Sequence, residues 1–122
     1  MNASEDTYIL YAEDDMDDRK LLSDMLTDLN SRIRLVCVNN GAELIDYLQK
    51  LKPRARYPSF ILLDINMPVM DGLQTLEVLQ STAELKEIPV IVYSTTPPGG
   101  KHLSKLGGIE YMKKPVRVQD VV

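Results

Sequence analysis

A carboxylate ends the most apolar stretch of this chain. Residues 60–63 (FILL) form the kind of continuous apolar run that is typical of a strand buried on both faces in a parallel sheet, and Asp64 follows directly. Pro68 and the pair Asp71-Gly72 then favour a loop. Open α/β folds bind their ligands at the carboxyl ends of strands. Asp64 is therefore a candidate nucleophile, a candidate metal ligand, or both.

Other polar residues follow neighbouring strands in the same way. Apolar runs at 8–12, 89–93 and 109–112 predict three further strands, and a parallel sheet brings all their carboxyl ends to one edge. Clustered carboxylates there need a cation, and oxygen ligands suit Mg²⁺ or Mn²⁺. A lysine and a hydroxyl beside them suit a phosphoryl group, so the set favours formation of an aspartyl phosphate. The residues expected at this edge are Glu13, Asp14, Asp15, Asp64, Asn66, Ser94, Thr95, Thr96 and Lys114.

Helices are predicted between these strands. Asp15, Asn40 and Asp71 are interpreted as N-caps, with Glu43 as the capping-box partner of Asn40. A further strand is expected at 33–38, so strands alternate with helices and predict a parallel sheet covered on both faces. The apolar stripes expected on the three helices are Leu21, Leu22, Met25, Leu26 and Leu29; then Ala42, Leu44, Ile45, Leu48 and Leu51; then Leu73, Leu76 and Leu79.

The pattern weakens towards the C-terminus. The segment 95–100 (TTPPGG) breaks regular structure, and only a short helix over 101–106 fits after it. Only residues 116–122 remain for a last helix, which we expect to be truncated or absent. Apolar surface exposed there would favour a homodimer.

Composition narrows the class of protein. The 122 residues suit one domain, 1–122, and the net charge of −4 argues against nucleic-acid binding. No apolar run approaches the ~20 residues of a membrane span, and the polar N-terminus does not resemble a signal peptide. A single cysteine, Cys37, excludes an internal disulfide. We expect a cytoplasmic protein.

The chain resembles response-regulator receiver domains of two-component signalling, from Tyr8 to Pro115. The family's phosphoacceptor in a D-x-x-M-P-x-x-D-G context corresponds to Asp64. Its acidic pair corresponds to Glu13 and Asp14, and the lysine of its K-P dipeptide corresponds to Lys114. The resemblance implies a flavodoxin-like sheet of order 2-1-3-4-5. It also implies a hydroxyl residue at Ser94 and a switch aromatic at Tyr111.

The resemblance also implies a mechanism. Asp14, Asp64 and the backbone carbonyl of Asn66 would ligate Mg²⁺, with Glu13 acting through water. A histidine kinase or a histidine phosphotransfer protein would supply a phosphoryl group to Asp64, and Lys114 would neutralise its charge. Ser94 and Tyr111 would then move and change the surface offered to an output partner. Residues Asn66 and Thr96 would tune dephosphorylation.

Other interpretations remain open. Asp15, Asp17, Asp18 and Asp71 are better explained as helix caps or a solvated face than as ligands. The lone His102 makes neither a metal site nor a phosphohistidine donor. A Mg²⁺-dependent phosphohydrolase would need an acid/base where Asn66 stands. A flavin-binding module would not place three acidic residues after its first strand. A degenerate receiver that only docks a partner is the remaining alternative.

Overall fold

Five parallel strands form a single sheet in the order β2-β1-β3-β4-β5. The computed structural model describes residues 8–29, 32–51, 56–95 and 110–114. The order reverses between β1 and β3, and open α/β sheets bind their ligands at the carboxyl edge beside such a switch point. The strands are β1 (Tyr8–Ala12), β2 (Arg34–Val38), β3 (Phe60–Leu63), β4 (Val90–Ser94) and β5 (Glu110–Lys113). The predicted sheet and its order are confirmed.

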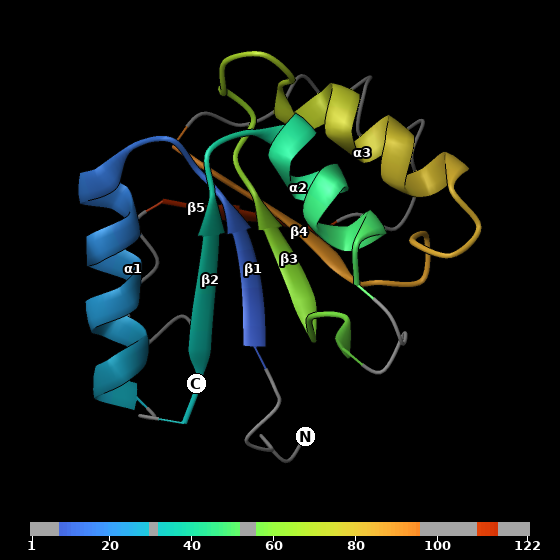
Figure 1. Ribbon diagram of the computed structural model, residues 1–122. Coiled ribbons are helices and arrows are strands. Elements are labelled where there is room, and N and C mark those ends of the chain that lie inside the picture. The colour runs from blue at the N-terminus through green and yellow to red at the C-terminus, as the bar shows by residue number, and fades with distance from the viewer. Residues whose placement is uncertain (1–7, 30–31, 52–55, 96–109, 115–122) are drawn as a thin grey trace.

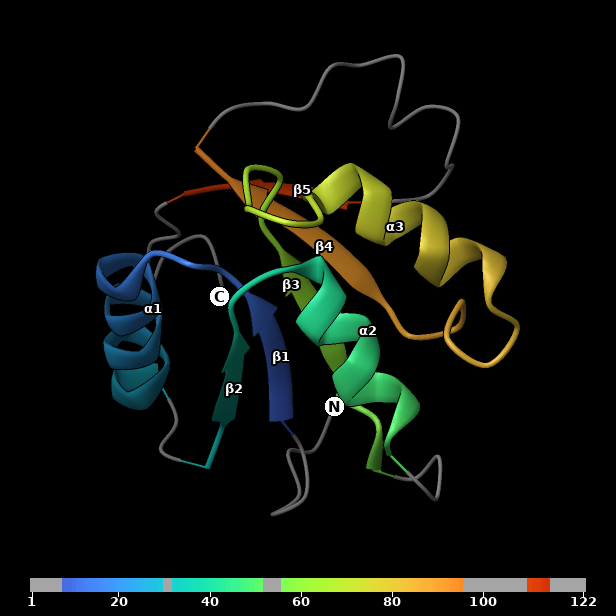
Figure 2. The same cartoon turned by 45° about the horizontal axis from the view of Figure 1, so that its top comes forward.

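Helices cover both faces of this sheet (Figure 1). Helix α1 (Met16–Leu29) lies on one face, and α2 (Gly41–Gln49) and α3 (Gly72–Ser81) lie on the other, as the turned view of Figure 2 also shows. Because β1 and β3 are sandwiched between these layers, their residues are almost all buried, which explains their continuous apolar sequence.

Each face has its own apolar core. Leu22 and Leu26 of α1 pack on the side chains of one sheet face, which include Tyr11, Leu62 and Tyr93. The other face carries the larger cluster. Its members come from β1, β3 and β4, from α2 and α3, and from the turn after α3: Leu10, Ala12, Leu44, Leu48, Ile61, Leu63, Leu76, Leu79, Leu85, Ile88, Val90 and Val92. Alternating residues of one strand therefore point to opposite cores.

The strand registers align the ends that carry the polar residues. Ala12, the last residue of β1, pairs with Val38 on one side and with Leu63 on the other. Leu63 in turn pairs with Val92 of β4. Glu13 and Asp64 therefore leave adjacent strands at the same level, which is the placement that the sequence predicted.

The N-cap residues of the three helices lie at this same carboxyl edge of the sheet. Asp15 accepts hydrogen bonds from the backbone N–H groups of Asp17 and Asp18, and Asp71 forms a capping box with Gln74. Asn40 caps α2 as predicted. The capping-box prediction for Glu43 was wrong, because its carboxylate accepts from the N–H of Asn39 instead of that of Asn40.

Three further differences concern surface and boundaries. Leu21 was predicted on the buried stripe of α1 but is 55% exposed, because this helix turns only Leu22 and Leu26 fully into the core. The strands β2, β4 and β5 each begin one residue later than predicted. The short helix expected at 101–106, His102, and the truncated or absent last helix lie outside the described residues.

No helix in the described part of the chain is both long enough and apolar enough to cross a bilayer.

Candidate functional site

Asp64 stands at the carboxyl end of the central strand β3 and is buried, with 7% of its surface exposed. Its backbone N–H donates to the carbonyl of Ala12, and its Oδ1 accepts from the N–H of Ile65 at 2.8 Å. Burial raises the pKa of this carboxyl, while hydrogen-bond donors around it, including the backbone of Ile65, act in the opposite direction. Asp64 is thus a carboxylate held in one orientation at the edge of the sheet.

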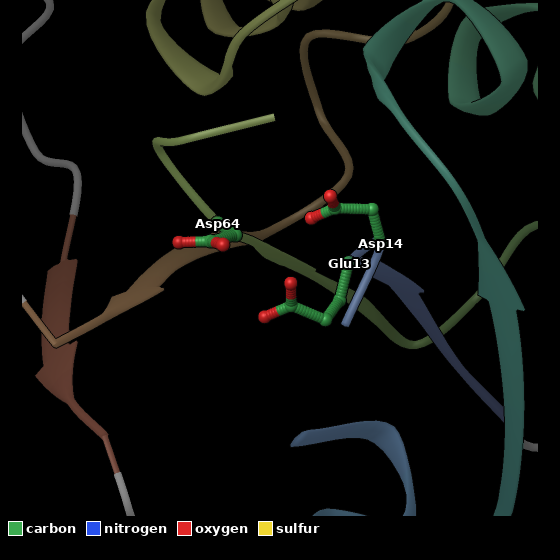
Figure 3. Close-up of side chains that lie close together, drawn as sticks. All are labelled: Glu13, Asp14 and Asp64. Atoms are coloured by element: carbon green, nitrogen blue, oxygen red, sulfur yellow. The ribbon is translucent and has the colours of Figure 1, made fainter. Parts of the chain in front are cut away.

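Two further carboxylates converge on Asp64 from the end of β1. Glu13 is buried and Asp14 is exposed, and each offers an oxygen so that the three ligand atoms, with one from Asp64, lie within 4.8 Å of one another. Figure 3 shows Glu13 and Asp14 extending from the end of β1 towards Asp64. An all-oxygen donor set with one open, solvent-facing side suits a hard divalent cation that keeps some of its water. The predicted acidic cluster is therefore assembled by the fold.

The backbone of Glu13 is held in place on both sides. Its N–H donates to the carbonyl of Val38 at 2.9 Å, and its carbonyl accepts from the Nε of Arg19 at 2.6 Å. Arg19 also donates to the Oδ1 of Asn39, which joins the start of α1 to the loop after β2. The acidic pair is therefore anchored by hydrogen bonds to the end of β2 and to Arg19 of α1.

Lys114 lies next to both Glu13 and Asp64. Its ammonium pairs with Glu13, with Asp18 at 3.0 Å and with Asp64 at 3.4 Å, and its side chain is only 6% exposed. The backbone N–H of Lys114 donates to the carbonyl of Ser94. This hydrogen bond fixes the position of Lys114 relative to the end of β4. Burial lowers the pKa of Lys114 to about 8. The lysine therefore neutralises part of the acidic cluster.

Two aromatic rings flank this lysine, and the sequence analysis did not single them out. The Lys114 Nζ lies 5.9 Å from the ring centroid of Tyr11 and 5.6 Å from that of Tyr93, within range of a cation–π interaction. The hydroxyl of Tyr11 also donates to Oε1 of Glu13 at 3.1 Å. An aromatic residue two positions before the acidic residue was the available signal, since alternation turns it to the face of α1.

Ser94 ends β4 next to Asp64 and is 1% exposed. Its Oγ makes no hydrogen bond of normal geometry with any residue that the structure describes, yet it lies close enough to Asp64 to lower the pKa of that carboxyl. The backbone carbonyl of Ser94 accepts from the hydroxyl of Tyr111 at 3.1 Å as well as from Lys114. Tyr111, which is partly buried, is thereby connected to the edge of the site.

The remaining predicted residues divide into three groups. Asn66 follows Asp64 in the loop after β3 and is exposed, while Thr96 lies outside the described residues. Asp15 and Asp71 cap helices as predicted. Asp18 was interpreted as a cap or solvated residue, and this was incomplete, because its carboxylate contacts the ammonium of Lys114. Nothing in the local sequence reveals this contact between residues far apart in the chain.

Gly72, the first residue of α3, allows this helix to start in close contact with the backbone of Asp64. The N–H of Gly72 donates to the carbonyl of Ile65 at 2.9 Å, and a Cβ at position 72 would overlap the carbonyl oxygen of Asp64. The loop between them includes Val69, which is exposed and has a positive φ of 68°. The glycine of the Asp71-Gly72 pair is thus explained by the lack of space for a side chain at this position.

The family described as "Response regulator receiver domain" matches residues 9–122. A two-component response regulator of rice (Oryza sativa), ORR3, is 31% identical over 116 residues, covering 93% of this chain and 84% of the rice protein. A protein-glutamate methylesterase/protein-glutamine glutaminase of Methanococcoides burtonii is 30% identical over 107 residues. The match covers 84% of this chain but only 28% of that protein.

Solved structures give the same family. A phosphorylated cyanobacterial phytochrome response regulator, RcpA, superposes with a TM-score of 0.78 at 30% sequence identity, covering 94% of this chain and 85% of that one. The Mn²⁺-bound form of response regulator Rcp1 superposes with a TM-score of 0.77 at 27% identity, covering 94% and 86% respectively.

Proposed function

The chain belongs to the response regulator receiver domain family, and on this premise we propose that it accepts a phosphoryl group from a phosphohistidine onto Asp64 in a Mg²⁺-dependent reaction. The observation that carries the proposal is the environment of Asp64: a buried carboxylate at a strand end, with a lysine ammonium 3.4 Å away and two more carboxylates beside it. An acceptor of a phosphoryl group needs this combination of nucleophile and positive charge.

The phosphoryl transfer would proceed in line. An Oδ of Asp64 attacks phosphorus while the P–N bond of the phosphohistidine breaks, and the released imidazole takes up a proton. Lys114 neutralises charge on the phosphoryl oxygens, and the Ser94 hydroxyl donates to one of them. Support for the role of Ser94 comes from its buried Oγ, which lies beside Asp64 and makes no hydrogen bond of normal geometry within the described part of the chain.

The donor set fits Mg²⁺, and Mn²⁺ as an alternative. Asp14 and Asp64 would supply carboxylate oxygens, the backbone carbonyl of Asn66 would be the third direct protein ligand, and Glu13 would act through a water on the ion. The ion, when bound, supplies positive charge that stabilises the transferring phosphoryl group. The existence of a Mn²⁺-bound form of the related response regulator Rcp1 supports the proposal that this chain binds a divalent cation.

The same site would act as a switch. We propose that Ser94 moves towards the phosphoryl group and that Tyr111, which donates to the carbonyl of Ser94, changes its position as a result. Asn66 and Thr96 would tune dephosphorylation. Residues 1–122 would form one cytoplasmic receiver domain that interacts with a histidine kinase or a histidine phosphotransfer protein and with an output partner, and a homodimer is a further proposal.

Intact mass after incubation with acetyl phosphate tests the chemistry. We expect the wild type to gain one phosphoryl group when Mg²⁺ is present and to gain none when Mg²⁺ is chelated. Asp64→Asn should gain none under either condition, because the amide is not a nucleophile. The control variant is Asp71→Asn, which keeps an N-cap and lies outside the acidic cluster. A wild type that binds Mg²⁺ but gains no mass would instead favour a receiver that only docks a partner.

A further inference from the structure

The ammonium of Lys114 contacts three carboxylates that come from three different elements. Glu13 follows β1, Asp64 follows β3, and Asp18 lies in the first turn of α1. The first two belong to the acidic cluster whose ligand atoms converge within 4.8 Å, whereas Asp18 does not. A cation bound to the cluster would therefore compensate the charges of Glu13 and Asp64 and leave that of Asp18 facing the lysine.

The position of Asp18 is set by the helix. Its backbone N–H donates to Oδ1 of Asp15 at 3.1 Å, within the N-cap of α1. Its side chain is 38% exposed, against 6% for Lys114, so the pair joins the protein surface to the buried edge of the site. Asp18 and Lys114 also line a small pocket of about 90 Å³, together with Leu21, Tyr93 and Thr95.

This contact opposes the binding of a phosphoryl group in two ways. A lysine has three N–H donors, and each donor that points to Asp18 is withdrawn from the phosphoryl oxygens. Asp18 and Asp64 contact the same ammonium, so their negative charges are also close enough to repel each other. Transfer to Asp64 increases the negative charge at that position and therefore increases the repulsion.

We propose that Asp18 is a positioning residue that acts through Lys114: it holds part of the lysine's charge away from the phosphoryl group and so limits the affinity of the site for that group. The inference rests on the proposed phosphoacceptor function and deepens it. Removal of the Asp18 charge strengthens phosphoryl binding. It also leaves Lys114 to pair more closely with Glu13 and Asp64, and this weakens Mg²⁺ binding.

The test compares Asp18→Asn with Asp17→Asn. The two residues are adjacent in α1, both donate their backbone N–H to Oδ1 of Asp15, and both variants remove one negative charge, but only Asp18 contacts Lys114. Calorimetric titration measures the affinity for Mg²⁺ alone and then the affinity for beryllofluoride, a phosphoryl mimic, at saturating Mg²⁺. Thermal unfolding establishes that each variant is folded at the temperature used.

We expect Asp18→Asn to bind beryllofluoride about three- to tenfold more tightly than Asp17→Asn, and to bind Mg²⁺ more weakly. A purely structural role would weaken both affinities together. Equal beryllofluoride affinity in the two variants, or weaker binding by Asp18→Asn, would overturn the role of Asp18. Failure of the wild type itself to bind beryllofluoride with Mg²⁺ present would instead contradict the proposed function.

Discussion

At the residue scale, the site concentrates buried charge. Glu13 is 1% exposed and its closest cation among the described residues is Lys114, which is itself buried. A buried ion pair is costly to form because both groups lose their hydration, and it adds little to stability. Loss of one partner is far more damaging, because the remaining charge stays buried without compensation. The pair is better explained by chemistry at Asp64 than by the needs of the core.

Lys114→Met should therefore destabilise the protein when no metal is present. We expect a loss of about 3 kcal/mol in the free energy of unfolding at pH 7, because Glu13 and Asp64 lose their buried cation. Mg²⁺ should restore part of this loss, since it replaces the missing positive charge. Urea denaturation with and without Mg²⁺ measures both effects.

Lys113→Met is the matched control for this prediction. Lys113 is exposed and forms no ion pair with any residue that the structure describes, so its replacement changes the net charge equally while leaving the cluster intact. Its stability should stay within about 0.5 kcal/mol of the wild type. A Lys114→Met variant as stable as this control would contradict the importance of the buried pair.

At the element scale, backbone hydrogen bonds of the segment between β3 and α3 fix the position of Asp64. Gly72 donates to the carbonyl of Ile65, and Gly41 at the start of α2 donates to the carbonyl of Met70. The Asp71 capping box then fixes the first turn of α3. The positions of β3, α2 and α3 thus determine where the Asp64 carboxylate points. Because their backbones are in close contact, a single added methyl group would disturb this arrangement.

Gly72→Ala should disturb the site and not only the helix. A Cβ at this position would overlap the carbonyl oxygen of Asp64 and would lie 2.8 Å from the Cα of Ile65. We expect a loss of about 2 kcal/mol in stability from overpacking. We also expect Mg²⁺ affinity to fall by at least about tenfold, because the backbone that carries one ligand must move.

Glu77→Ala provides the comparison for this substitution. Glu77 is exposed on the same helix, where alanine is well tolerated, so stability and Mg²⁺ affinity should both stay close to the wild type. Calorimetric titration with Mg²⁺ and calorimetric unfolding of the two variants test both expectations. Unchanged Mg²⁺ affinity in Gly72→Ala would show that the loop can adjust without displacing Asp64.

At the scale of the whole molecule, the parallel sheet directs the ends of all its strands to one edge. The chain carries a net charge of −4, and three of its carboxylates converge at that edge with one lysine beside them. Repulsion among these carboxylates destabilises the folded state, because the same groups lie farther apart in the unfolded chain. A divalent cation that binds only the folded state removes this cost.

Mg²⁺ should consequently raise the melting temperature. At a hundred times its Kd, linkage predicts about 2.7 kcal/mol of stabilisation, or an increase of about 10 °C for a domain of this size. Asp14→Asn should remove most of the increase, because Asp14 is exposed and contributes to the cluster without supporting the core. Thermal scans at constant ionic strength exclude simple screening, and an equal increase in this variant would place the metal elsewhere.

Local patterns determined much of the fold. Apolar runs and N-cap residues located all five strands and the starts of three helices to within one residue, because burial and capping depend on neighbouring residues. The parallel arrangement followed from the alternation of strands and helices, and it placed Glu13, Asp14, Asp64, Ser94 and Lys114 at one edge. The order of the strands came from the resemblance to receiver domains and is confirmed by the structure.

The contacts of individual side chains were decided only by the tertiary structure. Leu21 and Leu22 are adjacent in the sequence, yet the packing of α1 on the sheet buries only the second. Likewise, the pairing of Asp18 with Lys114 joins residues 96 positions apart. It depends on the level of β5 beside β4 and on where α1 starts. The sequence by itself determined which chemical groups meet at the edge. The packing of helix and sheet decided which of them touch, because such distances depend on the relative placement of elements that no local pattern encodes.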